Sequence, residues 1–330
     1  MYKLADIRAI HLEVTSRCQA KCPMCARREN GGPLNPYMGL DEITVDKFME
    51  WFDIDFIKQL NHLGMCGNLG DPIVAKDTVP ILQYLRETNP VMGLQMHTNG
   101  SGRTDKWWKE LAKLNVNVVF AIDGLADTHS RYRINTDWNK IIHNVMTFVD
   151  AGGSARWDML VFEHNEHQVE SCRELSQRLG MTNFSVKHTT RFRDGKFRVL
   201  NEQGQQIDTL FPTDKSRKMM GKVKQSQEEH LPKINCKAVK DSMMYVSALG
   251  TVTPCCWLDQ QFYPPSHESR IDYLTKIKIW PNLNHTGLKD IFASGYFDRI
   301  AGCWDSGGLR ECSRQCGTFD KLNEQFVERT

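Results

Sequence analysis

Three cysteines in one short loop restrict what this chain can fold into more than any other feature. Cys18, Cys22 and Cys25 are spaced C-x3-C-x2-C and follow an apolar run, residues 7–14, that predicts a β-strand. Thiolates are soft ligands that suit zinc or an iron–sulfur cluster. A structural zinc site needs a closed set of four ligands, and no further Cys or His lies close after Cys25. The loop therefore favours a four-iron cluster with one open iron over a zinc knuckle or scattered buried cysteines.

Strand and helix patterns alternate along the first part of the chain. Strands are predicted at residues 7–14, 60–65, 92–96, 116–122, 157–162 and 184–187. Helices are predicted at residues 41–56, 79–85, 107–114, 138–151 and 169–179. Further along the chain, two strands are predicted at 243–246 and 251–254 and a helix at 288–300. The alternating order of the first part predicts a parallel α/β sheet with right-handed crossovers, of which roughly six units form a partial version of the eight-unit barrel. The cysteine loop, Gly70-Asp71, Thr98-Asn99 and Asp123 follow strands, at the end where barrel active sites are built.

The composition is that of an ordinary globular protein. The chain has 330 residues, 40% hydrophobic and 25% charged, enough for one large domain and a small one. A net charge of +2 gives no strong signal for a polyanion such as a nucleic acid. Because no apolar run is long enough to span a membrane and no signal-peptide core is present, we expect a cytoplasmic protein. Eleven cysteines in such a chain favour metal or redox chemistry over disulfides.

The cysteine loop resembles the signature of the radical SAM superfamily. The resemblance implies a [4Fe-4S] cluster on Cys18, Cys22 and Cys25 whose open iron chelates S-adenosylmethionine (SAM). It implies that one electron cleaves the sulfonium to give a 5′-deoxyadenosyl radical, with a flavodoxin- or ferredoxin-type protein as electron donor. It also implies an open (β/α)6 partial TIM-like barrel.

Further elements at strand ends resemble the SAM-binding motifs of that family. Gly70 and Asp71 resemble its Gly-Gly-Glu-Pro element, which holds the methionyl amino group, although Asp71 is shorter than Glu. Thr98 and Asn99 resemble a third-strand Thr-Asn-Gly placed near the ribose and the methionyl part. Residues 121–133, which contain Asp123 and His129, resemble a further SAM-contacting element.

That stretch ends in Arg133, whose guanidinium suits bidentate pairing with a carboxylate. The family usually has a serine where this chain has Ala121, so one polar SAM contact is expected to be lost. The alternatives for these short elements are ordinary turns and a surface arginine.

A second cysteine group resembles the SPASM/twitch extension of the same superfamily. Cys236-x13-Gly250-x4-Cys255 matches its opening and Cys312-x3-Cys316 its closing pair. This implies one auxiliary [4Fe-4S] cluster on Cys236, Cys255, Cys312 and Cys316. The open alternatives are Cys256 or Cys303 in place of one ligand, and a four-cysteine zinc ribbon. We therefore predict a barrel domain at 1–200, a linker or mobile cover at 201–235 and a twitch/SPASM-like domain at 236–330.

Cysteines outside both groups have two predicted uses. Cys66 and Cys303 are candidate hydrogen donors, because radical epimerases use a thiol in that way, whereas Cys172 is predicted to be a small buried hydrophobe. A basic stretch after the sixth strand is predicted to bind an anionic substrate or to be a solvated face; it contains Lys187, Arg191, Arg193, Lys196 and Arg198.

These patterns together predict a radical SAM enzyme that abstracts hydrogen from a substrate. Dehydrogenation, crosslinking and epimerisation all fit, and the auxiliary cluster either accepts an electron or shapes the pocket. Because about ten residues precede the first motif, too few for a recognition domain, we expect a small molecule or a peptide delivered by a separate protein. The alternative function is a non-catalytic zinc or iron–sulfur protein, either a binding module or an electron carrier.

Overall fold

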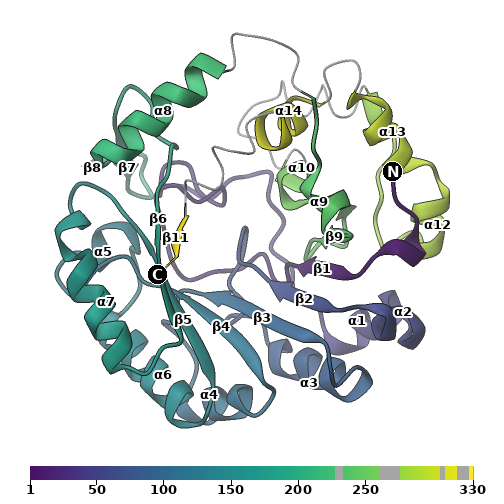
Figure 1. The fold of residues 1–330 in the computed structure, drawn as a ribbon, viewed down its shortest axis with the longest axis horizontal. Coiled ribbons are helices and arrows are strands. Elements are labelled where there is room, and N and C mark those ends of the chain that lie inside the picture. The colour runs from purple at the N-terminus through teal and green to yellow at the C-terminus, as the bar shows by residue number, and fades with distance from the viewer. Residues whose placement is uncertain (227–232, 261–275, 305–308, 318–326, 330) are drawn as a thin grey trace.

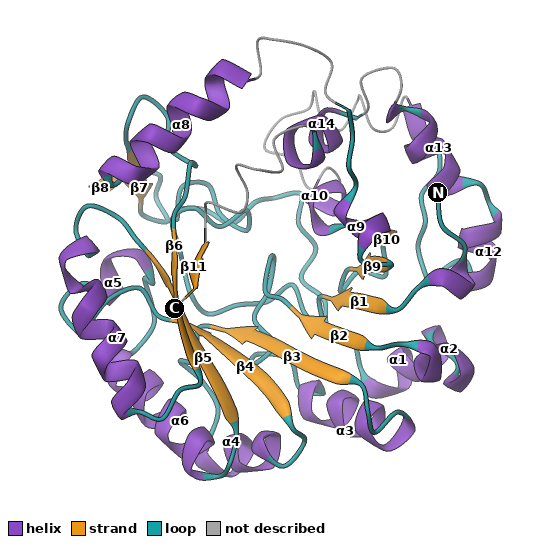
Figure 2. Ribbon diagram, viewed as in Figure 1, coloured by secondary structure: helices purple, strands orange, loops and turns teal. Residues whose placement is uncertain are grey.

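A computed structural model describes residues 1–226, 233–260, 276–304, 309–317 and 327–329 (Figure 1). Its main feature is a nine-stranded sheet in the order β10-β9-β1-β2-β3-β4-β5-β6-β11, with helices outside it (Figures 1 and 2). The central strands, all parallel, are β1 (Ala9–Leu12), β2 (His62–Met65), β3 (Gly93–Thr98), β4 (Val116–Ala121), β5 (Ser154–Leu160) and β6 (Asn183–Lys187). The predicted parallel α/β partial barrel is confirmed.

Four of the seven outer helices begin at a side-chain cap. The seven are α1 (Val45–Trp51), α2 (Ile54–Gln59), α3 (Thr78–Thr88), α4 (Asp105–Ala112), α5 (His129–Tyr132), α6 (Trp138–Asp150) and α7 (Val169–Arg178). Thr44, Thr104 and Asp137 each accept a backbone N–H of the first turn, which satisfies one of its unpaired donors. The helix predicted at 41–56 is in fact two, because the Asp53 side chain caps a new helix, α2.

The two faces of the sheet differ in chemistry. Alternate residues such as Leu12, Met65 and Trp157 face the helices and are fully buried in one hydrophobic core. The side chains between them lie on the opposite, inner face, and many of these are polar or charged. In a closed eight-unit barrel, by contrast, bulky apolar side chains fill the interior.

Strands from the C-terminal part extend the same sheet. β9 (Met243–Val246) pairs in parallel with β1, and β10 (Val252–Thr253) pairs antiparallel with β9. β11 (Val327–Arg329) pairs antiparallel with β6 at the other edge. The two strands predicted between 243 and 254 are confirmed. Residues on either side of position 236 therefore share one sheet, and the division into domains stays a prediction.

The segment 201–235, predicted to be a linker, contains regular structure. β8 (Gln206–Leu210) forms a hairpin with β7 (Phe197–Leu200), and α8 covers Asp214–Ser226. Polar residues dominate this segment, so its few buried apolar side chains formed no recognisable pattern in the sequence. Leu210 and Met220 belong to a small core that contains Phe162 and Cys22.

Short helices complete the C-terminal part. These are α9 (Lys237–Lys240), α10 (Cys256–Asp259), α12 (Leu288–Ala293), α13 (Tyr296–Gly302) and α14 (Arg310–Cys316). The helix predicted at 288–300 is split at Gly295, whose positive φ of 75° interrupts the helix. Among the helices described, none has the length and apolar character needed to cross a membrane.

Candidate active site

The loop with Cys18, Cys22 and Cys25 is held by side chains that bind its backbone. The guanidinium of Arg27, only 5% exposed, donates to the carbonyls of Ser16 (3.0 Å) and Cys18 (3.1 Å). Two further donors, Asn135 and Arg191, bind the carbonyls of Gln19 (2.7 Å) and Met24 (2.8 Å). The loop therefore has a fixed shape before any ligand binds.

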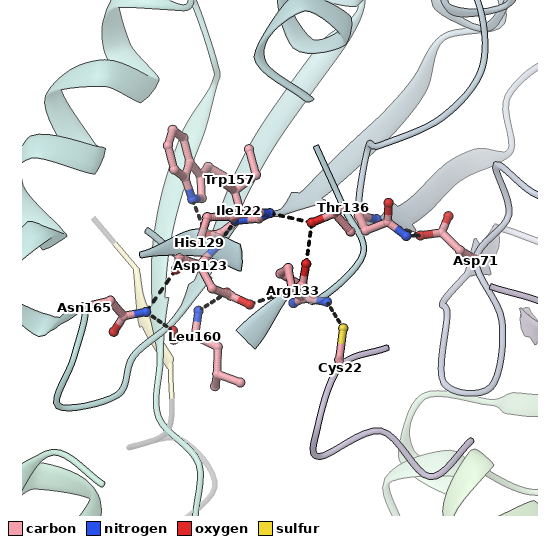
Figure 3. A network of polar contacts seen from close by, with 11 residues as sticks. Cys22, Asp71, Ile122, Asp123, His129, Arg133, Thr136, Trp157, Leu160 and Asn165 are labelled. Carbon is pink, nitrogen blue, oxygen red and sulfur yellow. Dashed lines mark hydrogen bonds and ion pairs between the residues drawn. The ribbon is translucent and has the colours of Figure 1, made fainter. Parts of the chain in front are cut away.

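Two N–H donors point at thiol sulfurs of this loop. Asn99 Nδ2 lies 3.6 Å from Cys18 Sγ, and Arg133 Nη1 lies 3.7 Å from Cys22 Sγ (Figure 3). Burial raises the pKa of Cys22 to about 11, although Arg133 opposes the rise. A buried thiolate therefore needs a metal cation beside it, and donors aimed at the sulfur stabilise the resulting ligand. The three thiols, with N–H donors aimed at two of them, fit the ligand set of an iron–sulfur cluster.

A tight turn after β2 is packed against the start of this loop. The buried carboxylate of Glu13 accepts the backbone N–H groups of Asn68 (2.7 Å) and Leu69 (3.4 Å). A Cβ on Gly70 would lie 1.8 Å from the carbonyl oxygen of Thr15, so only glycine fits. Glu13 was not predicted as a site residue. The signal in the sequence was an acidic residue within the predicted strand 7–14.

Asp71 joins the ends of β2 and β3. Its carboxylate, 4% exposed, accepts hydrogen bonds from Thr98 Oγ1 (2.8 Å), Asn99 N (2.7 Å), Asn99 Nδ2 (2.5 Å) and Ile73 N (3.1 Å). Three of the residues predicted to bind cofactor are thus brought together, and Asp71 holds Asn99 in place against Cys18. A direct contact of Asp71 with SAM stays a prediction.

The other two predicted cofactor residues form a buried ion pair. Arg133 Nε lies 2.5 Å from Asp123 Oδ2, and Asp123 Oδ1 accepts the N–H of Leu160 at 2.6 Å (Figure 3). Burial alone would lower the pKa of Arg133, but the Asp123 carboxylate more than offsets this and raises it. Arg133 is therefore a permanent cation placed between Asp123 and Cys22.

His129 and Asn165 fix the geometry around Asp123, and neither was predicted as a site residue. His129 Nδ1 accepts the Asp123 N–H (3.1 Å), so its Nε2–H faces Thr136 Oγ1 at 3.1 Å. Asn165 Nδ2 donates to the carbonyls of Asp123 (3.1 Å) and Leu160 (3.0 Å) (Figure 3). His129 lies only six residues after Asp123, within the stretch 121–133 noted in the sequence, whereas Asn165 reaches Asp123 from a distant loop, which no local pattern reveals.

Acid is expected to destabilise the fold through His129. Burial, and then Arg133, lower its pKa to about 3, whereas an unfolded histidine has the ordinary value of about 6.5. The unfolded state therefore takes up the proton first as pH falls, and stability is lost progressively below about pH 6.5. Between pH 7 and pH 5 this group alone removes about 2 kcal/mol.

Unfolding in urea at pH 7 and pH 5 measures this effect. His129→Gln should be less stable at pH 7 and should lose less stability on going to pH 5. His167→Gln, at an exposed position of the same protein, is the matched control and should behave like wild type. An equal pH dependence in wild type and His129→Gln would contradict the assignment.

The second cysteine group lines one cavity. Cys236, Cys255, Cys312 and Cys316 surround an empty volume of ≈340 Å³, which includes open solvent at its mouth. Apolar side chains complete most of the wall, among them Ile234, Trp257, Leu258 and Ile300. Four cysteines that line one largely apolar cavity are a suitable ligand set for a closed four-thiolate cluster or zinc site.

The remaining predicted cysteines are not among the residues lining this cavity. Cys256 lies next to Cys255 at the start of α10, and Cys303 Sγ lies 3.2 Å from the carbonyl of Arg299 at the end of α13. Cys66 follows β2, and its carbonyl lies 3.4 Å from His11 Nε2 on the inner face of the sheet. Cys172 is fully buried, as predicted. Hydrogen donation by Cys66 or Cys303 stays a prediction.

Comparison with known sequences gives a family match and a curated relative. Residues 12–175 match the family model described as the Radical SAM superfamily. Over 120 residues the chain is 28% identical to the tungsten-containing aldehyde ferredoxin oxidoreductase cofactor-modifying protein of Pyrococcus furiosus. That match covers 34% of this chain and 30% of the relative, so the chain spans less than a third of its length.

Solved structures resemble this fold over most of its length. Streptococcus suis SuiB superimposes with a TM-score of 0.61 at 14% identity, covering 96% of this chain and 73% of that one. SuiB bound to S-adenosylmethionine gives a TM-score of 0.58 at 14% identity, covering 87% of this chain and 65% of that one. Native anSMEcpe with bound AdoMet gives 0.59 at 13% identity, covering 96% and 95%. At such identities the likeness establishes the fold.

Proposed function

This chain belongs to the radical SAM superfamily, and on that premise we propose that it uses a 5′-deoxyadenosyl radical, cleaved from SAM, to abstract a hydrogen atom from a substrate. The observation that carries the proposal is the pair of N–H donors aimed at Cys18 and Cys22 in a loop of fixed shape. A [4Fe-4S] cluster held by Cys18, Cys22 and Cys25 supplies the electron for that cleavage when bound.

The residues around the loop have separate tasks in this proposal. Gly70 lets the backbone approach the bound SAM closely, and Asp71 positions Thr98 and Asn99 beside it. Arg133 is the cation suited to the methionyl carboxylate, and Asp123 fixes its orientation. Cys66 is the proposed hydrogen donor where the reaction is an epimerisation, because it follows β2 at the same end of the barrel as the cysteine loop.

We propose that Cys236, Cys255, Cys312 and Cys316 hold an auxiliary [4Fe-4S] cluster. Their shared cavity supports this set over the alternatives with Cys256 or Cys303. Such a cluster offers an acceptor for one electron, which suits a net two-electron oxidation, or it only shapes the substrate pocket.

Replacing Cys255 with alanine is expected to remove the auxiliary cluster alone. Iron should fall from about eight to about four per chain, because three thiolates no longer close that site. Formation of 5′-deoxyadenosine from SAM and dithionite should persist. Anaerobic iron and sulfide analysis measures the change, and Cys303→Ala, which leaves the cavity wall intact, should keep about eight irons. Equal iron in Cys255→Ala and wild type would contradict this ligand set.

One experiment tests the proposed function as a whole. The EPR signal of the dithionite-reduced holoprotein should change when SAM is added, because SAM ligates the open iron. Zinc without iron would overturn the proposal and favour a non-catalytic zinc module. An EPR signal of bound iron that does not change when SAM is added, with no 5′-deoxyadenosine formed, would favour an electron carrier.

The substrate and partners are proposed more broadly. One solved SuiB structure is bound to the precursor peptide SuiA, and the Pyrococcus furiosus relative is named for modifying a cofactor. We propose a peptide or a small molecule as the substrate, a flavodoxin- or ferredoxin-type electron donor and a cytoplasmic location for this chain.

A further inference from the structure

A charged cluster lies on the inner face of the barrel, on strands other than those that carry the SAM-binding elements. Arg156 and Asp158 come from β5 and Lys187 from the end of β6, and these strands pair in parallel. Trp157, between Arg156 and Asp158, and Val186, just before Lys187, are buried in the core on the helix side. The alternation of a strand therefore places the three charged side chains together on the opposite face.

Asp158 is shared by two cations. Arg156 binds it bidentately, with Nε 2.9 Å from Oδ1 and Nη2 3.1 Å from Oδ2, and the Lys187 ammonium pairs with the same carboxylate. Asp158 is 5% exposed, whereas the side chains of Arg156 and Lys187 are 25% and 35% exposed. Burial alone would raise the pKa of Asp158, but Lys187 and Arg156 outweigh it and lower the pKa.

Among the side chains that the structure describes on this face, one positive charge is left uncompensated. Arg133 is matched by Asp123, and the His11 imidazole by Glu13 at 3.5 Å. His97 adds no charge at neutral pH, because burial and then Lys187 lower its pKa to about 4. Two cations against one carboxylate thus give the Arg156–Asp158–Lys187 cluster a net charge of +1.

This cluster also faces the proposed reaction centre. The charge of Lys187 acts on the Asp123 carboxylate, which follows β4, and on the Cys66 thiol, which follows β2. Strand β3, separated from β5 by β4, adds a neutral pair, with Gln95 Nε2 2.7 Å from His97 Nε2. Partly exposed cations beside neutral hydrogen-bonding groups form a site for a polar ligand rather than a packed core.

We propose that Arg156 and Lys187 bind an anionic group of the substrate, a carboxylate or a phosphate, inside the barrel. This inference rests on the proposed function, since it places the substrate beside the SAM site. Asp158 is a positioning residue, because it holds both cations on the inner face and competes with the ligand for them. Gln95 and His97 hydrogen-bond the same end of the substrate.

Calorimetric titration of the SAM-bound holoprotein at low salt tests this site with simple probes. Glutarate and inorganic phosphate carry the two candidate anions, and 1,5-pentanediol is the neutral analogue of glutarate. We expect at least one anion to bind and the diol not to bind. The tighter anion identifies the group that the substrate carries.

Variants then assign the binding to the cluster. Lys187→Met and Arg156→Met should each weaken anion binding roughly tenfold or more, as expected for a charge-assisted hydrogen bond. Asp158→Asn should strengthen it, because both cations lose their competitor, whereas a purely structural Asp158 would give weaker binding. Lys109→Met is the matched control at an exposed lysine of the outer helix α4 and should bind like wild type.

Two results would overturn the proposal. One is no anion binding at millimolar concentration, and the other is equal binding by wild type and Lys187→Met, which would mean an adventitious ion only. Formation of 5′-deoxyadenosine with SAM and dithionite is measured in parallel for every variant. Its absence in wild type would reject the proposed function, whereas its retention without anion binding would reject only this site.

Discussion

Cys22→Ala is expected to abolish reductive cleavage of SAM while leaving the rest of the protein folded. Two remaining thiolates cannot hold the SAM-binding cluster, so about four of about eight irons should be lost, together with the SAM-dependent EPR change. The yield of 5′-deoxyadenosine should fall by roughly a hundredfold or more, since the electron source for cleavage is gone. Anaerobic iron analysis and quantification of 5′-deoxyadenosine measure both effects.

Cys172→Ala is the matched control for this substitution. Cys172 is also buried, but it lies on α7 and belongs to neither cysteine group. Its replacement should keep the iron content and SAM cleavage of wild type, with a small loss of stability from the cavity it leaves. A full yield of 5′-deoxyadenosine from Cys22→Ala would refute the assignment of the loop.

Gly70→Ala is expected to have the largest structural effect of any single methyl group added to the site. The new Cβ would lie 1.8 Å from the Thr15 carbonyl oxygen, which belongs to the backbone just before the cysteine loop. The turn or the loop must therefore move, and we expect a loss of about 2–4 kcal/mol in unfolding free energy. Iron bound at the SAM site should fall as well, because the displaced loop carries its ligands.

Thermal unfolding and iron analysis of the reconstituted protein measure this change. Gly221→Ala in α8 is the control, since a Cβ there meets nothing within 4 Å. It should be neutral or more stable by up to about 1 kcal/mol, because alanine favours a helix. If Gly70→Ala were as stable and as rich in iron as Gly221→Ala, the close approach of the two backbones would be wrong.

Local patterns in the sequence predicted those parts of the molecule that depend on residues close together in the chain. Hydrophobic periodicity gave the order of strands and helices in the barrel, and the motifs were correctly placed at the carboxyl ends of strands. The resemblance to the SPASM/twitch extension also grouped Cys236, Cys255, Cys312 and Cys316, which all line one cavity in the structure.

Contacts between distant residues could not be predicted in this way. Nothing near Glu13 in sequence shows that its carboxylate binds the backbone of Asn68, and the substitution of Asp71 for Glu gave no sign that its oxygens face Asn99. Helix α8 was missed because its few apolar residues pack against a small core that the sequence does not reveal as one unit. Lys187 was predicted only as part of a basic stretch, because its partner Asp158 lies on another strand.

The pairing of β9 with β1 has a consequence for synthesis of the protein. Ala9 pairs with His62 on one side and with Met243 on the other, so the second edge of the first strand waits for a partner more than 230 residues later. At translation rates of roughly 5–20 residues per second, that edge of the sheet stays open for about 10–50 s. The cysteine loop directly follows β1, so it lies beside this open edge throughout the interval. Cluster insertion is therefore best timed after release of the chain, when β9 has closed the edge beside it.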